Sequence, residues 1–131
     1  MLKKIKDKLR VLRGKQSTVW GLTFKPDTDD IRASIAIDLV AEDANVSVYD
    51  PTGLENFART DLGSKTVPFT DPLEAVRNSE PLVLATGWPE FRDADFGLVK
   101  EPMHSPIIFD GRKQFDREML VEMGFDYYGI D

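Results

Sequence analysis

The residues from Thr18 to Pro51 have the sequence TVWGLTFKPDTDDIRASIAIDLVAEDANVSVYDP. The first part, Thr18 to Phe24, is a short apolar run rich in β-branched and aromatic residues, which predicts a buried strand. The loop from Lys25 to Asp30 follows, and apolar residues at helical spacing then predict a helix: Ile31, Ile35 and Leu39. Val46 to Tyr49 predicts a second strand. This order is a βαβ unit, in which ligands bind outside the carboxyl ends of the strands.

The rest of the chain continues the alternation of strands and helices. Further strands are predicted at 66–69, 81–86, 106–109 and 125–130, with helices at 54–62, 95–101 and 116–123 and a helix start capped by Asp71 and Pro72. We therefore expect an α/β fold with a Rossmann-like doubly wound, mostly parallel sheet of about six strands and helices on both faces. The expected strand order is 3-2-1-4-5-6.

An amphipathic connector helix is expected to precede this sheet. Apolar residues recur at helical spacing among lysines and arginines, and Gly14 stands where the helix would stop: Leu2, Ile5, Leu9 and Leu12. We divide the chain into a connector helix, residues 1–14, and a single domain, residues 15–131. A basic amphipathic helix can bind membranes, but this leucine stripe is narrow and lacks aromatics, which favours packing on its own or a preceding domain.

Composition excludes several classes of function. The net charge is −6 and the pI about 4.8, so no basic face for nucleic acid is expected. The absence of cysteine excludes disulfides, thiolate metal sites and a cysteine nucleophile within the chain. No apolar run approaches the length of a membrane span, and the basic N-terminus lacks the apolar core of a signal peptide. The expected location is the cytoplasm.

The loop after the first strand holds the first candidate site residues. Lys25 follows a buried strand on a proline-stiffened loop, where it either reaches an anion bound in the crevice or pairs with Asp27 or Asp29 as a solvated lysine. The carboxylates of this loop could bind magnesium, but capping of the following helix is the favoured interpretation. Arg32 in the first helical turn opposes the helix dipole, so a carboxylate or a phosphate should offset it.

Asp50 resembles the acid that binds ribose in dinucleotide-binding folds. However, the turn here is G-L-T-F-K-P, and Gly21 stands alone where the fingerprint G-x-G-x-x-G would be needed. We therefore do not expect a dinucleotide site of the usual kind, and we expect Asp50-Pro51 to form a strand-ending turn.

Asp110, Gly111 and Arg112 follow another apolar strand at the same expected edge of the sheet. Arg112 offers a planar fork suited to phosphate, although it could instead be a surface arginine paired with Asp110 or Asp116. Trp88 and Phe91 could stack on a base, but core packing is favoured. We assign no role to His104, the single histidine.

Four stretches together resemble the carboxyl-terminal domain of the UDP-glucose/GDP-mannose dehydrogenase family. They lie in the family's order and cover nearly the whole chain: GLTFKPDTDDIRAS from Gly21, VSVYDP from Val46, LATGWPEF from Leu84 and FDGRKQFD from Phe109. The resemblance implies a UDP-sugar-binding domain, whose enzyme oxidises the sugar C6 alcohol to a carboxylate. In that family an N-terminal domain binds NAD and supplies a catalytic cysteine, and a connecting helix follows it.

The resemblance also implies residue roles. Phe24, Lys25 and Arg112 would bind the substrate, and Arg32 would extend towards the NAD pyrophosphate across the domain interface. No catalytic or metal-binding residue is expected in this chain, so alone it should be inactive. The region between Ile31 and Pro51 is shorter than the family pattern by about one helical turn. The alternative function is a docking or homodimerisation module that uses the leucine stripe of the first helix.

Overall fold

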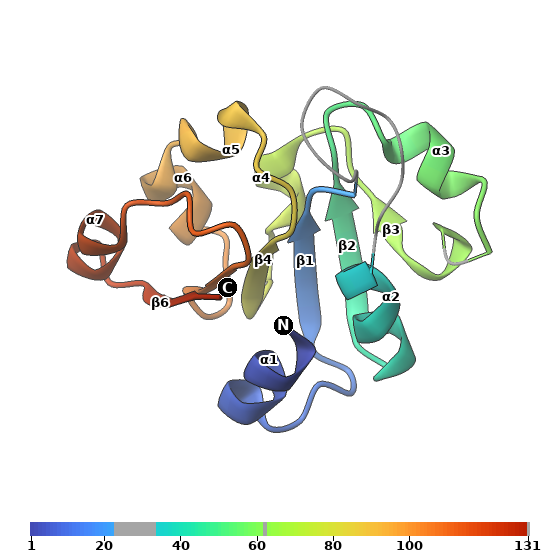
Figure 1. Cartoon of the computed structure of the whole chain (residues 1–131), viewed down its shortest axis with the longest axis horizontal. Helices are drawn as coiled ribbons and strands as arrows, with labels where there is room; N and C mark the ends of the chain where they lie inside the picture. The colour runs from blue at the N-terminus through green and yellow to red at the C-terminus, as the bar shows by residue number, and fades with distance from the viewer. Residues whose placement is uncertain (23–33, 62, 131) are drawn as a thin grey trace.

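The computed structural model describes residues 1–22, 34–61 and 63–130 (Figure 1). In this part of the chain six strands form one parallel sheet in the order β3-β2-β1-β4-β5-β6. The predicted fold class and strand order are therefore confirmed. The strands are β1 (Gln16–Trp20), β2 (Asn45–Tyr49), β3 (Val67–Pro68), β4 (Pro81–Leu84), β5 (Ile107–Asp110) and β6 (Asp126–Gly129).

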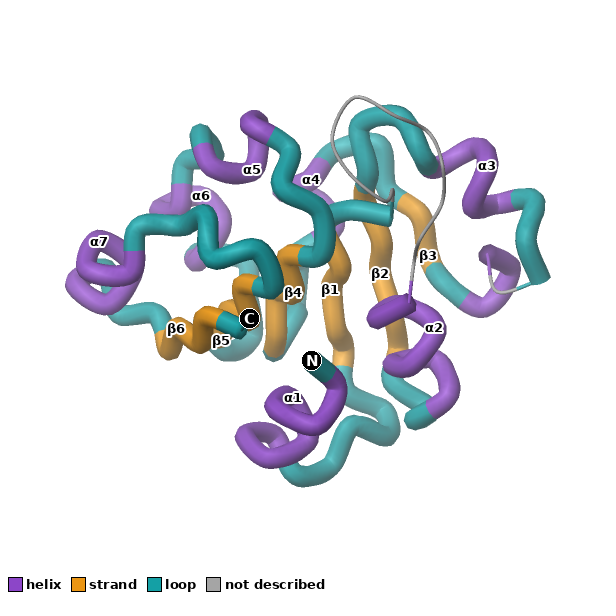
Figure 2. The backbone as a smooth tube through the Cα atoms, in the orientation of Figure 1, coloured by secondary structure: helices purple, strands orange, loops and turns teal. Residues whose placement is uncertain are grey.

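Helices cover both faces of the sheet (Figure 2). Side chains along a strand point alternately to the two faces, so Val83 joins one apolar cluster while Leu82 and Leu84 join the other. The Val83 cluster includes residues of the first three helices, and the other cluster lies under the remaining four. The helices are α1 (Leu2–Leu9), α2 (Ser34–Ala41), α3 (Leu54–Ala58), α4 (Pro72–Ala75), α5 (Pro89–Arg92), α6 (Phe96–Lys100) and α7 (Arg117–Glu122).

Helix α1 packs its apolar stripe on the chain's own sheet. Ile5 is fully buried and Leu12 is 3% exposed, and both belong to the cluster of Val83. Packing of this helix on its own or a preceding domain was predicted, and the structure shows packing on its own sheet. Its predicted end was wrong, because Arg10 adopts a positive φ of 67° and the helix stops at Leu9. Gly14, with φ of 75°, lies in the turn that follows and donates its N–H to Asp43.

Several further boundaries differ from the sequence predictions, and one helix was not predicted. Three elements are shorter than the predicted ranges 66–69, 81–86 and 54–62, namely β3, β4 and α3. Strand β1 begins at Gln16 instead of Thr18 and ends at Trp20, because Gly21 turns the backbone away with φ of 104°. Helix α5 was missed, since its four residues are too few to show a period; it starts with Pro89 in the first helical turn, as proline prefers. The Asp71 cap is confirmed, because its carboxylate accepts the Leu73 N–H at 2.9 Å.

Among the described residues, no helix has the length and apolarity needed to cross a membrane. The cytoplasmic location stays a prediction.

Candidate functional site

The carboxyl ends of the central strands lie level with one another. Trp20 in β1 is paired with Tyr49 in β2 and Leu84 in β4, and Leu84 is paired with Asp110 in β5. Between β1 and β4 the order of strands reverses, and in open α/β sheets this is where ligands bind. The loops that leave β1, β4 and β5 therefore start at one rim.

Gly21 brings the first two of these loops into close contact. A Cβ at this position would lie 2.5 Å from the backbone nitrogen of Thr86, and the positive φ also disfavours a side chain. The N–H of Gly21 donates to the carbonyl of Tyr49 at 2.8 Å. The chain therefore leaves β1 wedged between the ends of β2 and β4.

Asp50 folds the exit from β2. One oxygen accepts the N–H of Leu22 at 2.7 Å, and the other accepts those of Thr52 and Gly53 at 2.9 and 2.7 Å. The carboxylate is 2% exposed. The predicted strand-ending turn is confirmed, and because these N–H groups engage both oxygens, Asp50 is poorly placed to serve as a ribose acceptor.

Asp110 likewise accepts hydrogen bonds that fold the loop leaving β5. Its fully buried carboxylate accepts the N–H of Arg112 at 3.0 Å, that of Phe115 at 2.9 Å and the hydroxyl of Tyr127 at 2.7 Å. Burial, and then the bond to Asp110, raise the pKa of Tyr127. This cluster was not predicted from the sequence, where its one signal is an aspartate at the end of an apolar run, directly before glycine.

Arg112 is exposed and its guanidinium makes no ion pair with any residue of the described ranges. The two carboxylates weighed as its partners are used otherwise, since Asp110 binds backbone N–H groups and Asp116 caps α7 through the N–H of Met119 at 3.1 Å. A Cβ at Gly87 would lie 4.0 Å from Cγ of Arg112, so the loops after β4 and β5 touch. The guanidinium is therefore available to an anion at this rim.

A pocket of about 280 Å³ lies beside Arg112. Its wall combines the exits of β4 and β5 with the first turns of α1 and the middle of α2: Met1, Leu2, Ile35, Asp38, Ala85, Gly111 and Arg112. Met1 packs closely on Gly111, which has no side chain to obstruct it. Among the described residues of this wall, Arg112 has the one cationic side chain and Asp38 the one carboxylate, so an anion is favoured at the Arg112 end.

Three of the predicted site residues lie outside the described residues: Phe24, Lys25 and Arg32. The same holds for the aspartates weighed as a magnesium site. Within the ranges that the structure does describe, no three acidic or histidine side chains gather as a metal site would require.

Trp88 and Phe91 belong to the core. They are 8% and 1% exposed, and the ring of Phe91 stacks on that of Trp20 with centroids 5.0 Å apart. The favoured interpretation, core packing, is confirmed.

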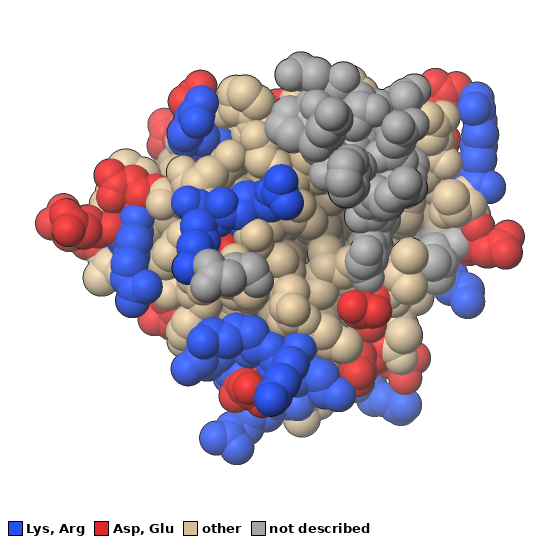
Figure 3. All heavy atoms as spheres, viewed as in Figure 1, with Lys and Arg blue, Asp and Glu red and all other residues tan. Residues whose placement is uncertain are grey.

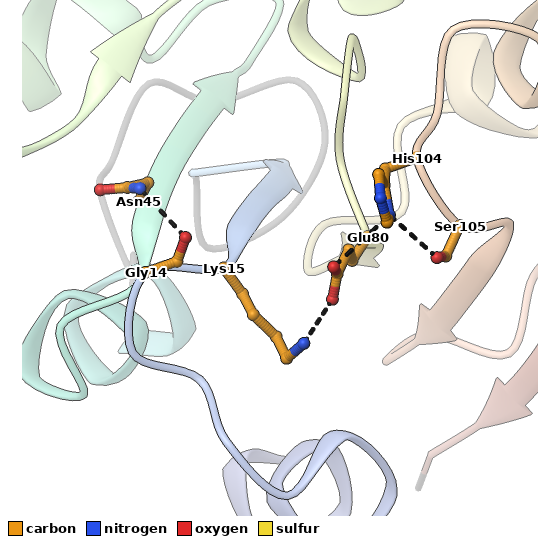
Figure 4. A network of polar contacts seen from close by, with 6 residues as sticks. All are labelled: Gly14, Lys15, Asn45, Glu80, His104 and Ser105. Atoms are coloured by element: carbon orange, nitrogen blue, oxygen red, sulfur yellow. Dashed lines mark hydrogen bonds and ion pairs between the residues drawn. The ribbon is translucent and has the colours of Figure 1, made fainter.

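His104 lies at the opposite, amino edge of the sheet (Figure 4). Its Nδ1 is 3.4 Å from Glu80, which also accepts a hydrogen bond of 2.7 Å from Lys15. Since Glu80 precedes β4 and Lys15 precedes β1, this network is separated from the Arg112 rim by the length of the strands.

An all-parallel sheet in this order, with the loops after β1, β4 and β5 at one rim, defines a domain of the Rossmann-like α/β class. Residues 18–117 match the UDP binding domain of the UDP-glucose/GDP-mannose dehydrogenase family. The chain belongs to this family, as the motifs in its sequence indicate.

Relatives and solved structures agree. The chain is 38% identical over 124 residues to the UDP-glucose 6-dehydrogenase of Rickettsia conorii and 40% identical over 123 residues to that of Rhizobium meliloti; each alignment covers 91% of this chain and 28% of the relative. A UDP-glucose dehydrogenase structure from Pyrobaculum islandicum superposes with a TM-score of 0.77 at 27% identity, covering 99% of this chain and 28% of that one. The chain thus spans little more than a quarter of these proteins' length.

Proposed function

We propose that the chain binds the UDP part of a nucleotide sugar at the carboxyl edge of its sheet. The observation that carries this proposal is the exposed guanidinium of Arg112, which has no ion-pair partner among the described residues and lies beside a pocket at that edge, in a chain that matches a UDP binding domain. A guanidinium can bind two oxygens of a diphosphate at once. Phe24 and Lys25 are proposed to bind the same ligand from the loop after β1.

The proposed context is an NAD-dependent nucleotide-sugar 6-dehydrogenase, in which this chain is the UDP-sugar-binding part. NAD itself does not fit this chain, because the glycine fingerprint is missing and the Asp50 carboxylate already binds three backbone N–H groups. NAD would be held mainly by a separate N-terminal dehydrogenase domain, with Arg32 reaching its pyrophosphate. The catalytic thiol must also come from outside the chain, which contains no cysteine.

The alternative, a docking or dimerisation module, has less support. It relies on the leucine stripe of the first helix, but Ile5 in α1 and Leu12 in the turn after it are buried against the chain's own sheet.

Isothermal titration with UDP tests the proposal. The Arg112→Ala and Lys25→Ala variants should each bind UDP about tenfold or more weakly than the parent, because each loses a charge-assisted contact. Arg77→Ala is the matched control, because this variant also loses one positive charge. Arg77 lies away from the proposed site, between α4 and β4, and pairs with Glu74 at 3.4 Å. No heat from the parent chain, or equal affinities in all four proteins, would count against UDP binding at this rim.

A further inference from the structure

We propose that the buried pair Asp110 and Tyr127 positions Arg112 for its ligand, so that both residues act on nucleotide affinity through Arg112 without touching the nucleotide. The inference rests on the proposed function for its ligand. Neither residue was among the site residues predicted from the sequence. Both are largely or fully buried, at 0% and 8% exposed, whereas Arg112 is exposed.

Hydrogen bonds to Asp110 tie the backbone of Arg112 to the buried carboxylate. Oδ1 of Asp110 accepts the N–H of Arg112 itself at 3.0 Å, while Oδ2 accepts the Phe115 N–H and the Tyr127 hydroxyl. A buried carboxylate is costly unless donors surround it, so the chain from Arg112 to Phe115 is drawn around Asp110. The Arg112 side chain thus extends from a backbone whose N–H is hydrogen-bonded directly to the buried Asp110 carboxylate.

Neighbouring hydrogen bonds hold the same loop. Gly111 donates to the carbonyl of Leu84 at 2.9 Å, and the Gln114 side chain donates to the carbonyl of Trp88 at 3.2 Å. Lys113 has a φ of 51°, a region that residues other than glycine occupy only when their surroundings enforce it. Several independent contacts therefore fix the backbone of this loop, and at Arg112 only the side-chain torsion angles remain free to change.

The charge of Asp110 is satisfied without the Arg112 guanidinium. Asp110 would be the natural ion-pair partner of Arg112, yet its oxygens are occupied by backbone and phenol donors. Tyr127 completes this set from β6, the neighbouring strand. Because the Tyr127 hydroxyl donates to Oδ2, Asp110 does not require a hydrogen bond from the Arg112 guanidinium. The guanidinium therefore remains directed to the rim.

Tyr127→Phe removes the phenol donor alone, and Asp110→Asn replaces one acceptor oxygen by an amide that faces donors. Titration with UDP should show affinity lowered about fivefold in Tyr127→Phe and about tenfold in Asp110→Asn, reflecting lost hydrogen bonds to a charged acceptor. Tyr49→Phe is the matched control, because Tyr49 is equally buried and donates to Glu90 at 3.1 Å on another element.

A double-mutant cycle separates positioning from general destabilisation. In the Arg112→Ala background, Tyr127→Phe and Asp110→Asn should cause no further loss of affinity, since the residue they act through is gone. The proposal is overturned if both variants bind UDP as tightly as the parent when Arg112 is present. It is also overturned if each variant loses the same affinity whether Arg112 is present or replaced by alanine.

If the parent chain gives no heat with UDP, the proposed function fails and the positioning role is decided by NMR. The order parameter of the Arg112 amide should then fall in Asp110→Asn and Tyr127→Phe but not in Tyr49→Phe. An unchanged order parameter at Arg112 in both variants overturns the positioning role itself.

Discussion

Asp50 and Asp110 show how single buried carboxylates shape the rim of this sheet. Each lies at or directly after the end of a strand, and each accepts hydrogen bonds that turn the following chain into a tight loop. Asp50 also accepts the N–H of Leu22, the last described residue before the loop that contains Lys25. Such aspartates resemble ligand-binding acids in sequence, but their oxygens are used by the fold.

Asp50→Ala should therefore lower the free energy of unfolding by about 3 kcal/mol, because buried N–H groups lose a charged acceptor. Asp71→Ala, which removes an exposed N-cap, should lower it by about 1 kcal/mol. Urea unfolding followed by circular dichroism measures both. Equal losses in the two variants would show that Asp50 does no more than an ordinary cap.

At the scale of elements, we expect the first helix to unfold together with the sheet. Its stripe reaches the cluster of Val83, and Lys6 pairs with Glu42 at 3.0 Å at the end of α2. Because the apolar side of α1 faces inward, its outer side is left to the lysines and arginines that gather there in Figure 3.

Ile5→Ala should cost about 3 kcal/mol of stability through the cavity it creates, and unfolding should stay a single transition. Val11→Ala, at a side chain 62% exposed, should change stability by less than about 0.5 kcal/mol. A parent-like urea midpoint for Ile5→Ala would contradict the packing of α1 on the sheet.

The elements also show what sequence reasoning can reach. Strand order and class followed from alternating periodicities and from the handedness of crossovers, which are properties of every residue in a segment. The end of α1 could not be predicted in this way, because it is set by a single backbone angle, the φ of 67° at Arg10. Helix α5 could not be predicted either, because its four residues are too few to show a period. Of the site, Arg112 could be chosen by its place after a strand, whereas the Asp110–Tyr127 contact joins residues 17 positions apart on neighbouring strands and shows no local signal.

At the scale of the whole molecule, charge is unevenly distributed. The chain carries −6 overall, yet its first fifteen residues contain seven lysines and arginines and one aspartate. The body of the domain is therefore strongly acidic, and we expect a diphosphate to be held where local cations are left unpaired, as Arg112 is among the described residues. This charge distribution favours an anionic ligand held by a few fixed contacts, because the net electrostatic field of an acidic domain does not attract anions.

UDP at one hundred times its Kd should stabilise the chain by about 2.7 kcal/mol, raising the melting temperature by several degrees. NAD at the same concentration should leave the melting temperature unchanged, because the loop after β1 lacks the glycine fingerprint and Asp50 already binds backbone N–H groups. Thermal unfolding with each ligand measures this. Protection by NAD equal to that by UDP would indicate a dinucleotide site instead.

The most direct measurement is an NMR titration of the ¹⁵N-labelled chain with UDP. The account predicts that amide shifts concentrate at the carboxyl edge, at Gly87, Gly111 and Arg112, and that the amino-edge amides of Lys15, Glu80 and His104 stay unchanged. Shifts centred on the amino edge, or none at saturating UDP, would contradict it.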